Sequence, residues 1–266
     1  MLILGIDTTA KTASAAVVNV GDVKPHDFTV LSEMKSSGRI THSENLVPMI
    51  DYTLKCAGIA LSEIDLFASA VGPGSFTGIR IGVATVKGLA FNPGFSGFAE
   101  RDINNCAAIS SLYALAYNFY GCKEGELPPS ASLPPPSIRE ARLILPVIDA
   151  RRKQVYNAVI SIGSDGINYV KHDRIITVKE LETELNSEFA GSKIVFTGDG
   201  ADMCYSEIDF AGKIQIPEIL KTPSASSVCR IAYRYYRNGR TVHARTLAPS
   251  YLIKTQAERE FDSHKK

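Results

Sequence analysis

The sequence has few residues in the spacings that metal or disulfide chemistry requires. Its five cysteines form no CxxC pair, and their odd number argues against a disulfide framework, so we expect reduced thiols. The five histidines are scattered, and no two of them are four residues apart. Because a metal site needs several converging ligands, we expect none here. There is also no G-x-S-x-G motif of the kind that marks a serine hydrolase.

Long hydrophobic runs and a net charge are absent as well. No apolar segment approaches the roughly 20 residues that a membrane helix needs. The first apolar run ends at Asp7 and has no basic residue before it, unlike a signal peptide. The 29 lysines and arginines nearly cancel the 28 acidic residues, so no overall field attracts nucleic acid or membrane. We expect a cytoplasmic protein without membrane contact, in which any RNA contact is local.

The most distinctive stretch is VGPGSFTGIRIGVATVKGLAF, residues 71–91. An apolar run typical of a buried strand precedes it, and a Gly-Pro-Gly turn opens it. Ser75 stands where a helix N-cap is expected, because its short side-chain oxygen can accept from the first turn. We expect the helix to end at Asn92, Pro93 and Gly94. Its N-terminus could bind an anion, but the turn has no phosphate-loop lysine.

Gly78 and Gly82 lie four residues apart and therefore on one face of this helix. Each costs roughly 1 kcal/mol relative to alanine in a helix interior. Two such costs on one face indicate that another backbone lies close to it. The spacing alone leaves open whether that face packs inside the chain or against another subunit.

The two halves of the chain repeat one order of elements: three strands, a helix, a strand and a helix. An acidic residue ends the first strand each time, at Asp7 and Asp149. Residues 103–120 are predicted to form a buried helix, and residues 123–137, rich in proline and serine, a surface insertion. The order predicts an α/β protein of two like lobes, 1–108 and 109–266. Each lobe is a mixed sheet with helices, as in actin, Hsp70 and sugar kinases.

Proteins of that architecture bind a nucleotide between their lobes. Asp7, Thr8 and Thr9 could partly hold metal-bound phosphates, and residues 197–201 resemble an adenosine-contacting loop. The second hairpin, residues 149–154, has no glycine, although a phosphate cradle needs bare backbone amides. We therefore expect a vestigial nucleotide cleft, formed by Asp7, Thr8, Thr9, Gly198, Asp199 and Gly200. A stand-alone ATP-dependent kinase or acyl transferase is the alternative.

Five segments, in the right order, resemble the bacterial TsaB (YeaZ) family, a subunit of the machinery that makes threonylcarbamoyladenosine in tRNA. They are LGIDTT, HSENLVPMIDYTL, residues 71–91, IDARRKQVY and APSYL. The resemblance implies a non-catalytic paralogue of the transferase TsaD that has no cofactor of its own. Whether a nucleotide binds where the two proteins meet is left open. In TsaD, a histidine pair after the central helix holds the active-site metal. The matching residues 98–105 contain no histidine.

The resemblance also implies partners. A TsaD-like transferase would bind through the helices expected at residues 44–57 and 75–91, and a second copy of the chain could use the same surface. A TsaE-like ATPase would join the assembly, and tRNA would be contacted indirectly. This favours an interface role for Gly78 and Gly82. The expected interface residues are His42, Leu46, Val47, Ile50, Leu54, Ser75, Gly78, Ile79, Gly82, Val83 and Val86.

One later segment mixes basic and aromatic residues. Arg230, Arg234 and Arg237 share a helical face, and Tyr233, Tyr235 and Tyr236 are interleaved with them. Such a mixture can hold phosphates and stack on bases. It is also compatible with an ordinary solvated helix face, and the sequence leaves both interpretations open.

Overall fold

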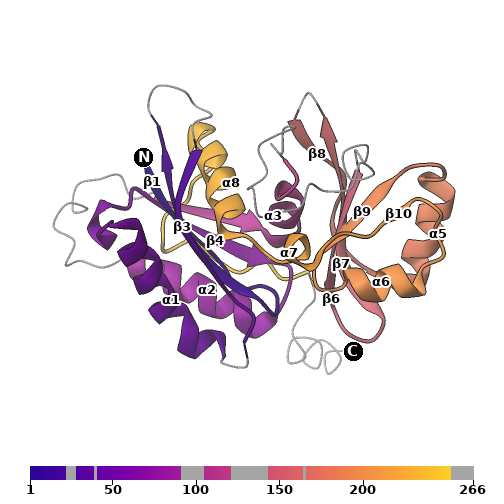
Figure 1. Ribbon diagram of the computed structural model, residues 1–266, viewed down its shortest axis with the longest axis horizontal. Helices are drawn as coiled ribbons and strands as arrows, with labels where there is room; N and C mark the ends of the chain where they lie inside the picture. The colour runs from indigo at the N-terminus through magenta and orange to yellow at the C-terminus, as the bar shows by residue number, and fades with distance from the viewer. Residues whose placement is uncertain (22–27, 39–40, 91–104, 121–142, 164–165, 253–266) are drawn as a thin grey trace, which may run out of the picture.

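The computed structural model describes residues 1–21, 28–38, 41–90, 105–120, 143–163 and 166–252. Two five-stranded sheets stand next to each other, with helices between them and on their outer sides (Figure 1). Several predicted features lie outside the described residues: the helix end at 92–94, the histidine-free residues 98–104, the insertion at 123–137 and the tail after residue 253.

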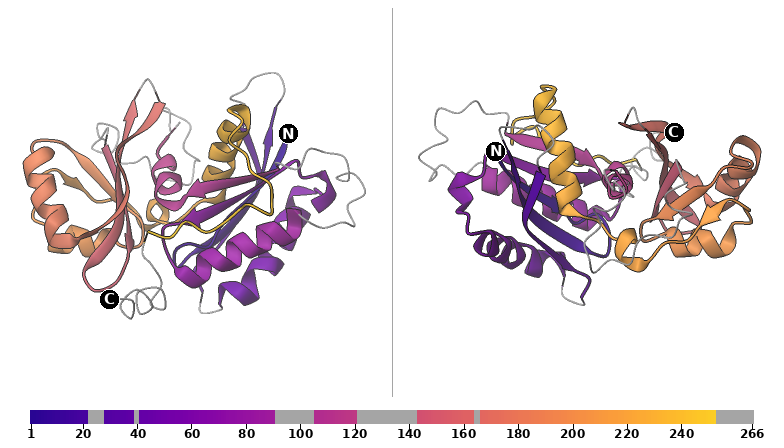
Figure 2. Two further views of the ribbon diagram at one scale, coloured as in Figure 1. Left: turned by 180° about the vertical axis from the view of Figure 1, so that it is seen from behind. Right: turned by 45° about the horizontal axis from the view of Figure 1, so that its top comes forward.

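The first sheet has the strand order β3-β2-β1-β4-β5. β1, β2 and β3 are antiparallel neighbours, whereas β4 is parallel to both β1 and β5. Helices α1 and α2 cover one face, and α8 covers the other (Figures 1 and 2). The elements are β1 (Leu2–Asp7), β2 (Ala13–Val20), β3 (Phe28–Ser36), α1 (His42–Ala57), the short η1 (Leu61–Glu63), β4 (Leu66–Gly72), α2 (Phe76–Ala90), β5 (Cys106–Ser110) and α8 (Ala225–Arg237).

The second sheet repeats this arrangement in the order β8-β7-β6-β9-β10. Again three strands are antiparallel neighbours and two more join in parallel. α5 and α6 cover its outer face, and α3 lies between the two sheets. The elements are α3 (Ser111–Tyr117), β6 (Leu143–Asp149), β7 (Gln154–Gly163), β8 (Gly166–Thr177), α5 (Val178–Glu188), β9 (Ile194–Thr197), α6 (Ala201–Glu207), β10 (Lys213–Ile214) and α7 (Glu218–Lys221). The predicted duplication is confirmed.

Three buried apolar clusters hold the layers together. One lies between the sheets and includes residues of α3 and α8, one lies beneath α1 and α2, and one lies beneath α5 and α6. Strands such as β4 are buried along their whole length. That explains their continuous apolar sequence, since a strand covered on both faces has no polar side.

The prediction of one helix over residues 103–120 is wrong. Within the described residues, Cys106–Ser110 is strand β5, and the helix begins only at Ser111. Ser110 Oγ accepts a hydrogen bond from Tyr113 N at 3.2 Å and so caps the new helix. A short apolar run does not distinguish a buried strand from a buried helix, and here the capping serine marks the change.

The chain returns to the first sheet after completing the second. α8 packs on β1, β2 and β5, and the strap that follows it, residues 239–252, runs along the same lobe. Cys106 N donates to Val242 O at 3.0 Å, and Ser250 N donates to Val71 O at 2.7 Å. The domain boundary near residue 108 stays a prediction, but α8 and the strap belong with the first sheet.

Gly78 and Gly82 face the end of β1 in the same chain. A Cβ built on Gly78 would overlap the carbonyl oxygen of Thr8, and one on Gly82 would lie 2.5 Å from Thr8 Oγ1. The Thr8 hydroxyl also donates to Gly78 O at 2.7 Å. The two glycines therefore allow α2 to approach its own sheet. Their assignment to a subunit interface is wrong.

We expect Gly78→Ala to lower the free energy of unfolding by roughly 1–3 kcal/mol, the range typical of overpacking. Gly88→Ala is the matched control, because Gly88 lies in the same helix and a Cβ there meets nothing within 4 Å. This control should stabilise the protein by up to about 1 kcal/mol. Urea denaturation measures both, and equal effects of the two variants would contradict the packing described here.

Candidate functional site

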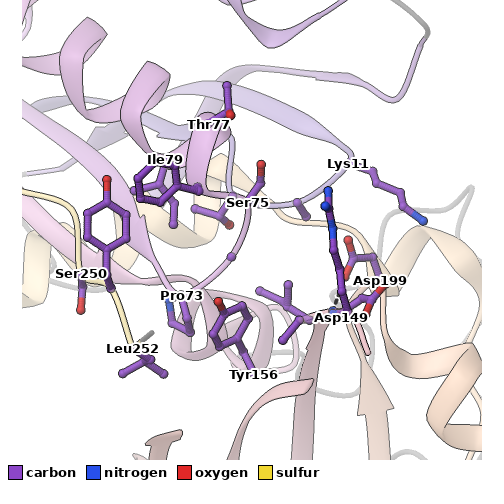
Figure 3. A pocket seen from close by; sticks show the side chains of 18 of the residues that line it. Lys11, Pro73, Ser75, Thr77, Ile79, Asp149, Tyr156, Asp199, Ser250 and Leu252 are labelled. Carbon is purple, nitrogen blue, oxygen red and sulfur yellow. Dashed lines mark hydrogen bonds between the residues drawn. The ribbon is translucent and has the colours of Figure 1, made fainter. Parts of the chain in front are cut away.

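A cleft of about 760 Å³ opens between the two lobes (Figure 3). Its walls are the turn after β1, the N-terminus of α2, the β6–β7 hairpin, the loop after β9 and the strap. The charged and polar side chains in its lining include Lys11, His42, Ser75, Thr77, Asp149, Arg151 and Asp199.

Asp7 lies behind the cleft wall and is fully buried. Its Oδ1 accepts from Thr9 N at 2.9 Å and from Thr9 Oγ1 at 2.7 Å. Its Oδ2 has no hydrogen-bond partner among the described residues. Burial raises the pKa of Asp7 to about 6, although the Thr9 donors and the charges of His42 and Lys35 act to lower it.

Only two of the six expected cleft residues line the cleft, Thr9 and Asp199. Thr8 is turned toward α2, and Gly198 and Gly200 pack against the end of β6. A Cβ on Gly198 would overlap Val147 O, and one on Gly200 would lie 3.2 Å from Asp149 N. The glycines after β9 therefore serve close packing against β6. Asp7, Thr8, Gly198 and Gly200 do not line the cleft.

The β6–β7 hairpin has an unusual backbone. Arg151, Arg152 and Lys153 have φ angles of 65°, 53° and 58°, in the left-handed region that L-residues disfavour by roughly 1–2 kcal/mol each. Asp149 supports the turn, because its Oδ1 accepts from Arg151 N at 2.7 Å. The hairpin therefore presents basic side chains, with no run of glycine amides that could wrap a phosphate. Nothing in the residue types predicts this backbone.

The cleft brings opposite charges together. Lys11 comes from the turn after β1, whereas Asp149, Arg151 and Asp199 all come from the second lobe (Figure 3). Burial raises the pKa of Asp199, whose Oδ1 accepts from Asp149 N at 3.1 Å. Within the described residues no three His, Cys, Asp or Glu side chains converge as they would around a metal ion. The arrangement favours binding of a small polar molecule and offers no evident nucleophile–base pair.

Most of the expected interface residues are core residues of this chain. In α1 and α2 the buried stripe packs on the first sheet, because an apolar stripe at helical spacing is what a helix uses to cover its own sheet. These residues cannot contact a partner, which corrects the prediction for Leu46, Ile50, Leu54, Gly78, Ile79, Gly82, Val83 and Val86.

The remaining three expected interface residues lie at the surface. Val47 is 59% exposed, Ser75 is exposed and His42 is partly exposed. Ser75 Oγ accepts from Gly78 N at 3.2 Å, which confirms it as the N-cap of α2. His42, the first residue of α1, has its Nε2 2.9 Å from Ala10 O and so contacts the turn after β1.

The outer faces of α1 and α2 carry apolar residues that the sequence analysis did not select. Tyr52 on α1 is 60% exposed and Phe76 on α2 is 39% exposed, and the small residue Ala84 of α2 is also exposed. The Arg80 guanidinium lies 3.9 Å from the Phe76 ring centre, and Arg80 Nε donates to Tyr251 OH at 2.9 Å. The sequence signal for these exposed residues is their position: they are apolar but lie off the buried stripe of their helix.

The two like lobes, their shared strand order and the cleft between them define a protein of the actin, Hsp70 and sugar-kinase class. The chain belongs to the family described as TsaD: tRNA N6-adenosine threonylcarbamoyltransferase, whose model matches residues 29–261. None of its described helices has both the length and the apolar character to cross a membrane.

Two relatives that match over nearly their whole length share one name. The chain is 27% identical to the tRNA threonylcarbamoyladenosine biosynthesis protein TsaB of Escherichia coli, over 95% of this chain and 94% of that protein. It is 26% identical to the TsaB of Haemophilus influenzae, over 95% and 93% of the two chains. A solved structure of YeaZ from Pseudomonas aeruginosa shares the fold with a TM-score of 0.68 and 22% identity, covering 94% of this chain and 99% of that one. These matches confirm the resemblance to the TsaB (YeaZ) family.

Asp7 makes stability depend on pH in a defined direction. Its folded-state pKa of about 6 exceeds the ordinary 3.8, so the folded state binds more protons than the unfolded state between these values. The free energy of unfolding should therefore fall by roughly 3 kcal/mol as pH rises from about 4 to about 6, and the Asp7 contribution should be constant above that. In Asp7→Asn this fall disappears, as chemical denaturation at a series of pH values would show.

Thr9→Val is the companion variant, because it removes the hydroxyl that donates to Asp7 Oδ1. The Asp7 pKa should then rise further, and the fall in stability should extend to higher pH. Identical pH profiles for the wild type and Asp7→Asn would show that Asp7 does not titrate as described.

Proposed function

We propose that this chain is a non-catalytic subunit of the machinery that attaches threonylcarbamoyl to adenine N6 in tRNA. In this proposal a TsaD-like transferase performs the chemistry, the chain binds and supports it, and a TsaE-like ATPase joins the assembly. The observation that carries the proposal is the match to TsaB proteins over 95% of the chain, together with family membership.

The state of the cleft supports an accessory role. Phosphate chemistry in this class needs an acid facing the cleft and a hairpin of bare amides. Here Asp7 is sealed behind Thr9, and the second hairpin carries three basic residues in left-handed conformations. A carboxylate in that position cannot reach a metal-bound phosphate in the cleft. We propose that the chain contributes binding surface rather than reacting groups.

The proposed partner surface is the outer face of α1 and α2. It carries Val47 and Tyr52 on α1 and Phe76 and Ala84 on α2, all of them exposed. Large exposed apolar side chains grouped on neighbouring helices are typical of protein interfaces. The same face would serve self-association of two copies, so the homodimer and the heterodimer with the transferase would exclude each other.

Val47→Glu should weaken binding to the TsaD-like partner at least tenfold, because a buried unpaired carboxylate in an interface costs about 2 kcal/mol or more. The variant should stay as stable as the wild type, since Val47 is 59% exposed in the monomer. Co-purification with a tagged transferase, followed by calorimetry, measures the effect.

Val170→Glu is the matched control: Val170 is 45% exposed and lies on β8 of the other lobe. It should bind the transferase like the wild type. If Val47→Glu and Val170→Glu both bind normally, the α1–α2 face is not the partner surface. If the wild-type chain itself does not bind a transferase of this family, the proposed function fails as a whole.

A further inference from the structure

The C-terminal part of the chain holds a concentration of positive charge that the nearly neutral whole conceals. No acidic residue stands between Glu218 and Glu258, whereas Arg230, Arg234, Arg237 and Arg240 all lie within that segment. These four arginines occupy the second half of α8 and the turn that follows it. Among the described residues, no carboxylate forms an ion pair with any of them.

Each of the four guanidinium groups is held over an aromatic ring. Arg230 lies 5.6 Å from the ring centre of Phe28, Arg234 5.9 Å from Tyr120, Arg237 6.0 Å from Tyr233 and Arg240 4.1 Å from Tyr235. Arg237 Nη1 also donates to Tyr233 OH at 3.2 Å, and Arg234 hydrogen-bonds Tyr117. A ring under the flat face of a guanidinium orients its plane, and each guanidinium has five N–H donors, more than these bonds use. These donors are suited to bidentate contact with phosphate oxygens.

The arginines form a stripe along α8 whose length can be compared with the spacing of phosphates in a nucleic acid. Arg230, Arg234 and Arg237 are at positions i, i+4 and i+7 of one helix, so they follow one face over about 10 Å. Along one strand of a nucleic-acid helix that distance spans roughly three phosphates. Tyr236, 50% exposed, lies next to this stripe and offers a ring on which a base can stack.

α8 lies on the opposite face of the first sheet from α1 and α2 (Figures 1 and 2). The sheet separates the two surfaces, so that a protein bound at α1 and α2 would leave the arginine stripe accessible. A polyanion held on α8 would therefore be held alongside the bound partner.

We infer that the arginine stripe of α8, formed by Arg230, Arg234, Arg237 and Arg240 with Tyr236, binds RNA directly, and that the RNA is the tRNA substrate of the complex. The choice of tRNA rests on the proposed function, whereas the affinity of the stripe for RNA phosphates does not. This inference replaces the expectation that tRNA is contacted only indirectly.

The test is binding of an unmodified, fluorescently labelled tRNA transcript to the purified full chain without a partner, measured by anisotropy from about 50 to 200 mM salt. Arg234→Glu/Arg237→Glu should weaken binding at least tenfold and reduce the salt slope by about 1.4–1.8, the value for two lost phosphate contacts. Arg234→Lys/Arg237→Lys keeps the charge and should retain most of the slope.

Lys179→Glu is the control for a change of charge, because Lys179 is exposed on α5 of the other lobe. It should bind tRNA like the wild type. Unchanged binding by the double glutamate variant would overturn the inference. So would equal competition by polyglutamate, which would show that the stripe recognises acidic protein segments.

The test of RNA binding and the test of the proposed function can succeed or fail independently of each other. The double glutamate variant should still co-purify with the TsaD-like transferase, since α8 lies away from α1 and α2. Loss of RNA binding with retained partner binding supports the stripe. RNA binding that depends on the stripe in a chain that does not bind a transferase would support the stripe while refuting the proposed function.

Discussion

The close approach of α2 to the end of β1 is the constraint on which the rest of the first lobe depends. Thr8 fills the space that side chains at Gly78 and Gly82 would otherwise take, and its hydroxyl bonds Gly78 O. That contact holds the turn after β1 beneath α2. In the same turn Thr9 folds back over Asp7 and donates two hydrogen bonds to its carboxylate, which is fully buried. The packing of α2 on β1 and the burial of Asp7 therefore share one physical cause.

The duplication and the strand order could be predicted because each depends on local signals: apolar runs, an acid after the first strand, and capping serines such as Ser75. The face of a helix that meets a partner could not be predicted in this way. Spacing shows that Leu46, Ile50 and Leu54 form a stripe, but an apolar stripe is equally suited to the chain's own sheet. Only the tertiary structure shows that this stripe packs on the chain's own first sheet.

Two further features were beyond sequence reasoning for different reasons. The change from β5 to α3 falls inside a run that is apolar on more than one side, so periodicity does not separate strand from helix there, and the local mark is the capping Ser110. The left-handed backbone of Arg151 to Lys153 contradicts local preference. It exists because Asp149 and the flanking strands β6 and β7 determine the turn, and such non-local control leaves no trace in the three residue types.

A five-stranded sheet covered by helices on both faces gives this small protein two separate outer surfaces. The α1–α2 face is apolar at Val47 and Tyr52, whereas the α8 face is basic and aromatic, and the first sheet lies between them. Apolar contact favours a folded protein partner, whereas guanidinium groups that form no ion pair with a carboxylate among the described residues favour a polyanion. In the proposed function the chain joins a transferase and its substrate by these two surfaces, and binding on opposite faces requires no reacting residue in the cleft.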